Sequence, residues 1–147
     1  MSLRSAGVWT YAVFNLGHIA GIGTLFGSVL LLDLRLLGCW RGIGLATISR
    51  PSVPLAIAGF ALAVATGVCM LTFNASEYYG NPFFLIKFPA IALGLVNVVV
   101  VSRMRAWRAR AERELSAGET LQLAVAGGFS LACWATALGA GRMIGYW

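Results

Sequence analysis

The chain has 147 residues, of which 59% are hydrophobic and only 11% are charged, and its mean hydropathy is +0.82. This composition excludes an ordinary soluble globular domain, which could not hide so much apolar surface from water. The formal net charge of +6 does not indicate nucleic-acid binding, because most basic residues fall in two short stretches between apolar runs. We therefore expect the lipid bilayer, and no nucleic acid, as the partner of the chain.

Four apolar runs are each long enough to cross a bilayer about 30 Å thick as a helix. They span residues 8–32, 53–73, 82–101 and 120–141, and only the third contains a charge, Lys87. The first run is too long for a secretory signal. No run shows the alternation of a barrel strand, and in hydrocarbon a helix satisfies its own backbone hydrogen bonds. The sequence predicts an all-α integral membrane four-helix bundle, with residues 1–147 forming one transmembrane domain.

The charges between the runs predict how the bundle is oriented. The connections after the first and third helices hold eight arginines: Arg35, Arg41, Arg50, Arg103, Arg105, Arg108, Arg110 and Arg113. Only Arg4, Lys87 and Arg142 remain for the opposite side. The positive-inside rule makes both arginine-rich loops cytoplasmic and places both termini outside. Residues 103–119 are expected to extend the third helix, and anionic lipid headgroups should attract their arginines.

The first helix carries two pairs of glycines at the spacing that lets helices approach closely. These pairs are Gly17 with Gly21 and Gly23 with Gly27, and they lie on different faces. We expect tight packing against several neighbours within the chain, which would make this helix a central one.

Two ionisable side chains stand where the bilayer makes burial costly, and such residues indicate a partner or a function. His18 lies about ten residues into the first helix and Lys87 about five residues into the third, so both fall in the outer half. Asn15 and Thr66 lie at comparable depth. We expect three helices to line one polar pocket there.

Two interpretations of these side chains remain open. His18 is either a hydrogen-bonded core residue or an axial ligand of haem iron, with Gly17 and Gly21 leaving room for the macrocycle. A bis-histidine haem within one chain is excluded, because His18 is the single histidine. Lys87 either extends outward to the headgroups or offers a positive charge to a porphyrin propionate or a quinone oxygen.

Other polar residues are interpreted as structural. Asp33 and Arg35 mark the end of the first helix, and Asp33 needs a cationic partner there, for which Arg50 is the candidate. Asn97 is expected to hydrogen-bond to a neighbouring helix. The three cysteines form no C-x-x-C or Cys/His pattern, and no motif for hydrolysis or nucleotide binding is present.

A set of these residues resembles a group of uncharacterised bacterial four-helix membrane proteins. The resemblance consists of His18, Gly21, Gly27 and the string Asp33 to Gly38 (DLRLLG), followed by Arg50-Pro51, Thr66-Gly67, Phe84-x-x-Lys87 and Asn97. More distantly, the chain is similar to the four-helix protoporphyrinogen oxidases that carry b-type haem and to membrane proteins of the copper-resistance D type. The oxidase resemblance implies a functional pair, His18 and Lys87. This chain lacks the additional histidines common around the oxidase lysine. The resemblance also implies a multi-pass protein of the bacterial inner membrane.

Three functions follow as expectations. The first is a small redox protein that handles haem b or another porphyrin, with His18 on the iron, Lys87 as the anion partner and Asn15 and Thr66 lining the pocket. The second is an accessory subunit without chemistry of its own, bound to other membrane subunits or to copies of itself. The third is a permease for copper or another small solute, although the cysteines and methionines form no cluster of the kind that Cu(I) prefers.

Overall fold

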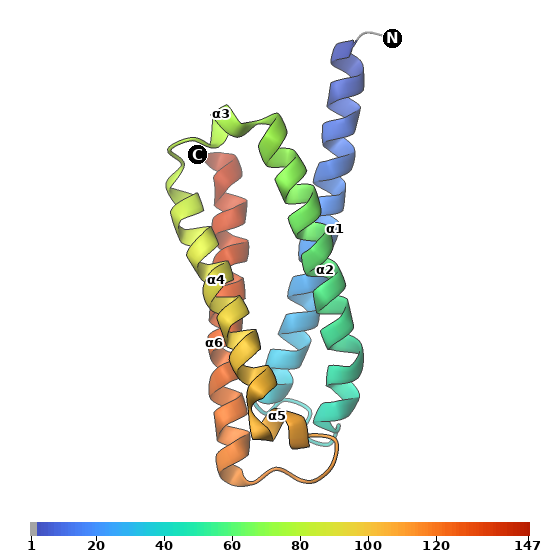
Figure 1. The fold of residues 1–147 in the computed structure, drawn as a ribbon, viewed down its shortest axis with the longest axis vertical. Helices are drawn as coiled ribbons and strands as arrows, with labels where there is room; N and C mark the ends of the chain where they lie inside the picture. The colour runs from blue at the N-terminus through green and yellow to red at the C-terminus, as the bar shows by residue number, and fades with distance from the viewer. Residues whose placement is uncertain (1–2) are drawn as a thin grey trace.

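The structure, a computed structural model, describes residues 3–147 without the side chains of residues 3–6 and Glu77, so Met1 and the Arg4 side chain lie outside it. It is all-α, with four long apolar helices packed as a bundle (Figure 1). Short helices stand between and after them. The elements are α1 (Leu3–Leu36), α2 (Leu45–Phe73), α3 (Ala75–Tyr78), α4 (Pro82–Arg103), α5 (Arg105–Ala109), α6 (Ala117–Met143) and the 3₁₀ turn η1 (Ile144–Tyr146).

Each long helix contains one of the four apolar runs and is long enough to cross a bilayer. Large apolar side chains are exposed along all four helices, most of all on α2 and α4. An exposed apolar surface of this extent requires lipid around it. The chain is therefore a multi-pass membrane protein.

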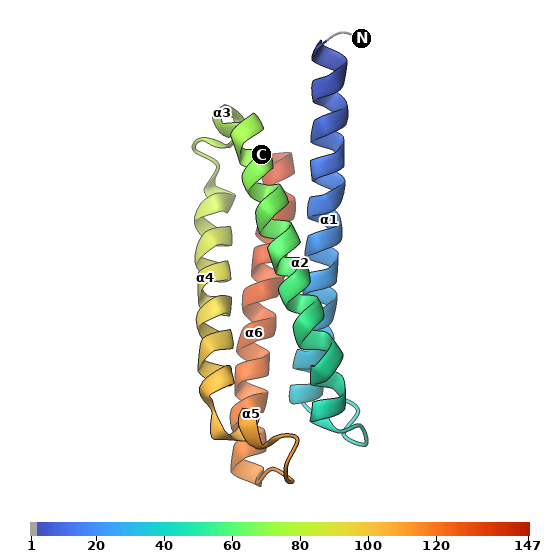
Figure 2. The ribbon, with the colours of Figure 1, turned by 45° about the vertical axis from the view of Figure 1, so that its right-hand side comes forward.

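The four helices are arranged as two antiparallel pairs. α1 packs along α2, α4 packs along α6, and the two pairs meet where α1 contacts α6 (Figure 2). We call the end of the bundle that holds the C-terminus and α3 the terminal end, and the opposite end the α5 end (Figure 1). The first turns of α1 extend beyond the other helices at the terminal end.

The α1–α2 pair is joined by an unusually close approach of two backbones. A methyl group added at Gly59 would lie 2.5 Å from the backbone nitrogen of Leu25, and one at Gly21 would lie 2.7 Å from that of Ala63. Gly17 faces the methyl group of Thr66. Without a hydrophobic force between helices in lipid, such contact of small residues supplies the packing energy.

The second glycine pair does not have the role that the sequence suggested. No atom lies within 4 Å of a methyl group built at Gly23 or Gly27, and both residues are exposed. The expectation that both pairs pack within the chain is wrong for this one, because α2 covers the opposite face of α1. α1 is nevertheless central, since it contacts both α2 and α6.

The α4–α6 pair is joined through a glycine and a tryptophan. Gly94 of α4 lies against the buried indole of Trp134, where a methyl group would meet ring atoms at 3.0 Å. Trp134 also makes an edge-on contact with Phe60, with ring centroids 6.2 Å apart. This side chain therefore links α6 to both α4 and α2.

Residues 103–119 do not extend the third helix. α4 ends at Arg103, Met104 takes an extended conformation, and the five-residue α5 folds against the bundle. The physical reason is burial: Ala106 is 1% exposed and packs with Leu36, Leu45 and Leu123 in the core of the α5 end. A straight extension of α4 would have left this apolar cluster open.

The next helix begins with a complete capping box, in which Ser116 accepts from the backbone of Glu119 and Glu119 accepts from that of Ser116. Arg113 clamps the Glu119 carboxylate with two hydrogen bonds of 2.6 and 2.8 Å. These interactions fix the loop that returns the chain to α6.

The glycine contacts generate a stability prediction. We expect Gly59→Ala to lower the free energy of unfolding by about 1–3 kcal/mol, because its new methyl group has no space against the α1 backbone. Gly27→Ala is the matched control, with a change within about 0.5 kcal/mol, because its methyl group meets no atom. Thermal unfolding in detergent, followed by circular dichroism, measures both. Equal losses in the two variants would contradict the proposed close contact.

Candidate functional site

His18 lies in the interface between α1 and α2, on the turn above the Gly21 contact. Its Nδ1 is 2.8 Å from the backbone oxygen of Ala63 and 3.1 Å from the hydroxyl oxygen of Thr66. The Thr66 hydroxyl donates to the oxygen of Leu62 at 2.6 Å, which leaves its oxygen as an acceptor. The histidine and Thr66, expected at one depth, are thus in direct contact.

These partners determine which ring nitrogen of His18 carries the proton. A carbonyl oxygen can only accept, so Nδ1 must be the donor. In the neutral imidazole, Nε2 then has a free lone pair, and no described residue donates a hydrogen bond to it. Two side-chain N or O atoms are buried without a hydrogen-bond partner, Asp33 Oδ2 and Trp134 Nε1, among residues 7–147 other than Glu77. His18 Nε2 has no partner and is not one of these buried atoms. It is therefore not closed off inside the protein.

The glycines beside His18 do not provide the space expected for a macrocycle. Thr66 and the backbone around Ala63 occupy the positions next to Gly17 and Gly21. Gly67 of α2 is in contact with the imidazole, since a methyl group there would lie 3.0 Å from Cε1. One face of the ring is therefore covered by α2, and a ligand can reach Nε2 only from another side.

The Lys87 side chain lies against the last turn of α6. It is half-buried on α4, and a methyl group at Gly141 of α6 would lie 3.6 Å from both its Cε and its Nζ. No described residue accepts a hydrogen bond from its ammonium group. No hydrogen bond joins Lys87 to His18 among the described side chains. The two side chains belong to different helix pairs, His18 to α1 and α2 and Lys87 to α4 and α6.

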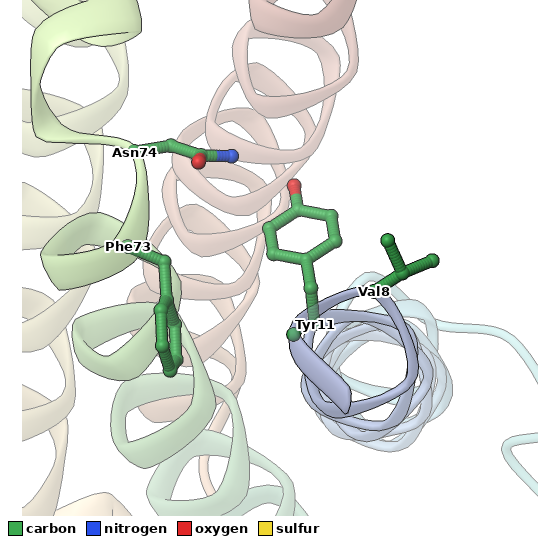
Figure 3. A pocket seen from close by; sticks show the side chains of 5 residues that line it. Val8, Tyr11, Phe73 and Asn74 are labelled. Carbon is green, nitrogen blue, oxygen red and sulfur yellow. The ribbon is translucent and has the colours of Figure 1, made fainter. Parts of the chain in front are cut away.

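A cavity of about 360 Å³ opens at the terminal end, between α1 and the last turn of α2. Figure 3 shows the Tyr11 hydroxyl and the Asn74 amide directed toward its centre, with Phe73 below and Val8 at the side.

The candidate site residues His18, Lys87, Asn15 and Thr66 do not line this cavity. The Phe14–Phe73 ring pair, with centroids 6.0 Å apart, forms part of the same α1–α2 contact. Asn15 is half-buried and makes no hydrogen bond to a described residue.

The residues interpreted as structural lie at separate contacts. Asn97 donates to the backbone oxygen of Ala126 at 3.1 Å and so joins α4 to α6. Arg35 donates to the oxygen of Ile43 at 2.8 Å and holds the turn after α1, where Gly38 and Trp40 have positive φ. Arg50 is exposed.

Asp33 has a different partner from the one suggested by the sequence. Its carboxyl group is 3% exposed and is hydrogen-bonded to Ser130 of α6, while Oδ2 has no partner. Asp33 and Arg50 do not form an ion pair. Among the described side chains, the one salt bridge joins Arg113 and Glu119.

Sequence reasoning missed both Ser130 and Trp134. The signal was available, because Gly127, Ser130, Trp134 and Ala137 recur at helical spacing along the buried face of α6. Nothing in that spacing identifies the partner of either side chain. The three cysteines are free, and the described side chains contain no group of three or more metal-binding residues of the types His, Cys, Asp or Glu.

Comparisons with known proteins add no family to this description. No family model matches the chain, no curated protein matches it, and no solved structure matches it.

The environment of Asp33 generates a prediction about charge. We expect Asp33→Asn to keep the stability of the native protein, because asparagine keeps the shape and an acceptor for Ser130 without needing a cationic partner. Asp33→Ala should lose about 1–3 kcal/mol, because it leaves a void and an unpaired Ser130 hydroxyl. Thermal unfolding in detergent compares them. If Asp33→Asn is as unstable as Asp33→Ala, the carboxylate has an essential cationic partner and our interpretation is wrong.

Proposed function

We propose that the chain is a small membrane redox protein that binds haem or another metalloporphyrin, with His18 Nε2 as the atom that would hold the metal. The observation that carries the proposal is the hydrogen bond from Nδ1 to the Ala63 oxygen. A histidine that ligates a metal characteristically donates its other ring N–H to a carbonyl or carboxylate, which fixes the ring and makes the free nitrogen more basic. The donor chemistry of His18 fits that role, and its accessible Nε2 allows a ligand to approach.

Lys87 supports the same proposal through charge. It carries its ammonium group against α6 and has no carboxylate partner among the described residues. An unpaired cation inside a bilayer is costly unless an anion joins it. A porphyrin propionate has the required charge. When bound, haem iron would supply one-electron transfer, while the chain would orient the imidazole and balance the anion.

The proposal includes an orientation. Eight arginines lie at or near the α5 end, against Lys87 and Arg142 among the described side chains toward the terminal end. The positive-inside rule then makes the α5 end cytoplasmic and both termini external, in a bacterial inner membrane. The His18 and Lys87 site would lie in the outer half of the bilayer.

The absorption spectrum of protein purified from haem-replete cells tests the proposal. We expect a Soret band that His18→Ala abolishes, because this variant removes the axial donor. Thr24→Ala is the control on the same helix: it changes an exposed side chain and should leave the band unchanged. Lys87→Gln should keep the band and lower the reduction potential, because a positive charge near the site is lost. A wild-type protein without a Soret band, or an unchanged band in His18→Ala, refutes the proposal.

A second candidate function is that of an accessory subunit without chemistry of its own. The observation that favours it is the free face of α1, where Gly23 and Gly27 are exposed and meet no neighbour within the chain. Small residues at this spacing allow another helix to approach closely.

Purification in mild detergent tests the accessory role. We expect stoichiometric partner subunits to be recovered with the native chain and lost with Gly23→Leu. A homogeneous, isolated chain under the same conditions argues against it. No feature of the described residues favours a copper or solute permease, and we do not propose one.

A further inference from the structure

Two arginines from separate segments come together at the α5 end. Arg50 stands in the second turn of α2, and Arg110 directly follows α5. Ser49, which is 1% exposed, connects them: it is the neighbour of Arg50 in the chain, and its hydroxyl oxygen accepts from Nε of Arg110 at 3.0 Å. Figure 1 shows how α5 lies between the ends of α4 and α2, which brings the two segments side by side.

Arg110 is held in a fixed geometry. Besides the bond to Ser49, its Nη1 donates to the backbone oxygen of Trp107 at 2.6 Å, and its guanidinium carbon lies 3.8 Å from the centre of the Trp107 ring. Nη2 donates to no described group. The planar guanidinium group is thus oriented in advance and retains free N–H donors, as bidentate recognition of an oxyanion requires.

The two positive charges have no carboxylate to balance them. Neither Arg50 nor Arg110 makes a salt bridge in the structure, and Glu119 is already held by Arg113. Partial burial and the adjacent Arg50 lower the pKa of Arg110. Like charges on neighbouring segments repel one another, so an anion bound by both arginines would relieve the repulsion.

The position of the pair indicates where that anion comes from. α5 follows the end of a membrane-spanning helix, and Trp107 is an aromatic residue of the kind that marks the interface between hydrocarbon and water. Lipid phosphates occupy this level. Arginines at such sites bind headgroups with more specificity than scattered surface charges do.

We propose that Arg50 and Arg110, with Arg110 positioned by Ser49 and Trp107, form a binding site for a phosphate group at the α5 end of the bundle. The site is distinct from His18 and Lys87, which lie in the other half of the membrane-spanning helices. Its ligand is a phosphate ester of an anionic lipid headgroup or a free phosphate ion, and these sources share the same recognition chemistry.

Titration of the detergent-purified chain with phosphatidylglycerol, followed by native mass spectrometry, tests the site. We expect Arg110→Gln and Arg50→Gln each to weaken binding about tenfold, the loss expected for one charge-assisted contact. Arg105→Gln is the matched control, because it removes the same charge from an exposed arginine of α5 and should leave the affinity unchanged. Arg110→Lys keeps the charge without the planar fork and should also weaken binding.

Inorganic phosphate, added as a competitor, distinguishes the sources. Competition at millimolar concentration identifies a site that a free phosphate ion fills, and lack of competition identifies the lipid headgroup; both support a phosphate site. Equal weakening by Arg105→Gln, or unchanged binding in both Arg50→Gln and Arg110→Gln, overturns the proposal, because retention would then depend only on the total charge. The folded state of each variant is checked by its thermal unfolding.

Discussion

The close contact between α1 and α2 at Gly21 and Gly59 is the constraint on which the rest of the bundle depends. Lipid tails are as apolar as leucine side chains, so helices in a bilayer gain little from burying apolar surface and must associate through close packing and hydrogen bonds. At these glycines the two backbones approach so closely that no side chain fits between them. This contact sets the distance at which His18 can reach a carbonyl oxygen of the opposite helix.

The close packing of α1 and α2 allows His18 to form a hydrogen bond that fixes its tautomer. A helix carbonyl normally has its own intrahelical partner, and the oxygen of Ala63 accepts from the imidazole in addition. Thr66 adds a second acceptor and turns its own proton toward Leu62. The ring is thereby fixed in one tautomer, with Nε2 directed away from its two hydrogen-bond partners. The same hydrogen bond therefore joins the two helices and leaves the lone pair of Nε2 free.

The two ends of the bundle differ in the kinds of side chains that they contain. Toward the terminal end, His18 and Lys87 lie within the long apolar runs of α1 and α4. At the α5 end, a small apolar core around Leu36 and Leu123 lies beneath a surface rich in arginines. α5 belongs to this second region, because Ala106 closes the core while the arginines on either side remain at the membrane surface.

The fold was largely predictable from the sequence, whereas the site was predictable only in part. Apolar runs of about 20 residues can only be spanning helices, so the four-helix bundle followed from length and composition. The sequence placed His18 and Thr66 at comparable depth, but depth alone did not predict the hydrogen-bond contact between them. The fold of residues 103–119 did not follow, because a helical pattern does not reveal that Ala106 is needed to close the core. The sequence also could not show that the two glycine pairs have different roles. Their spacing is the same, whether the helix face is covered by a neighbouring helix or exposed.

The protonation state of the imidazole tests the central claim most directly. Because the chain holds a single histidine, labelling this amino acid with nitrogen-15 reports on His18 alone. We expect the NMR spectrum of the protein in lipid bilayers to show a protonated Nδ1 and an unprotonated Nε2, with through-space transfer from Nδ1 to the carbonyl carbon of Ala63. A proton on Nε2, or no transfer to Ala63, would contradict the account.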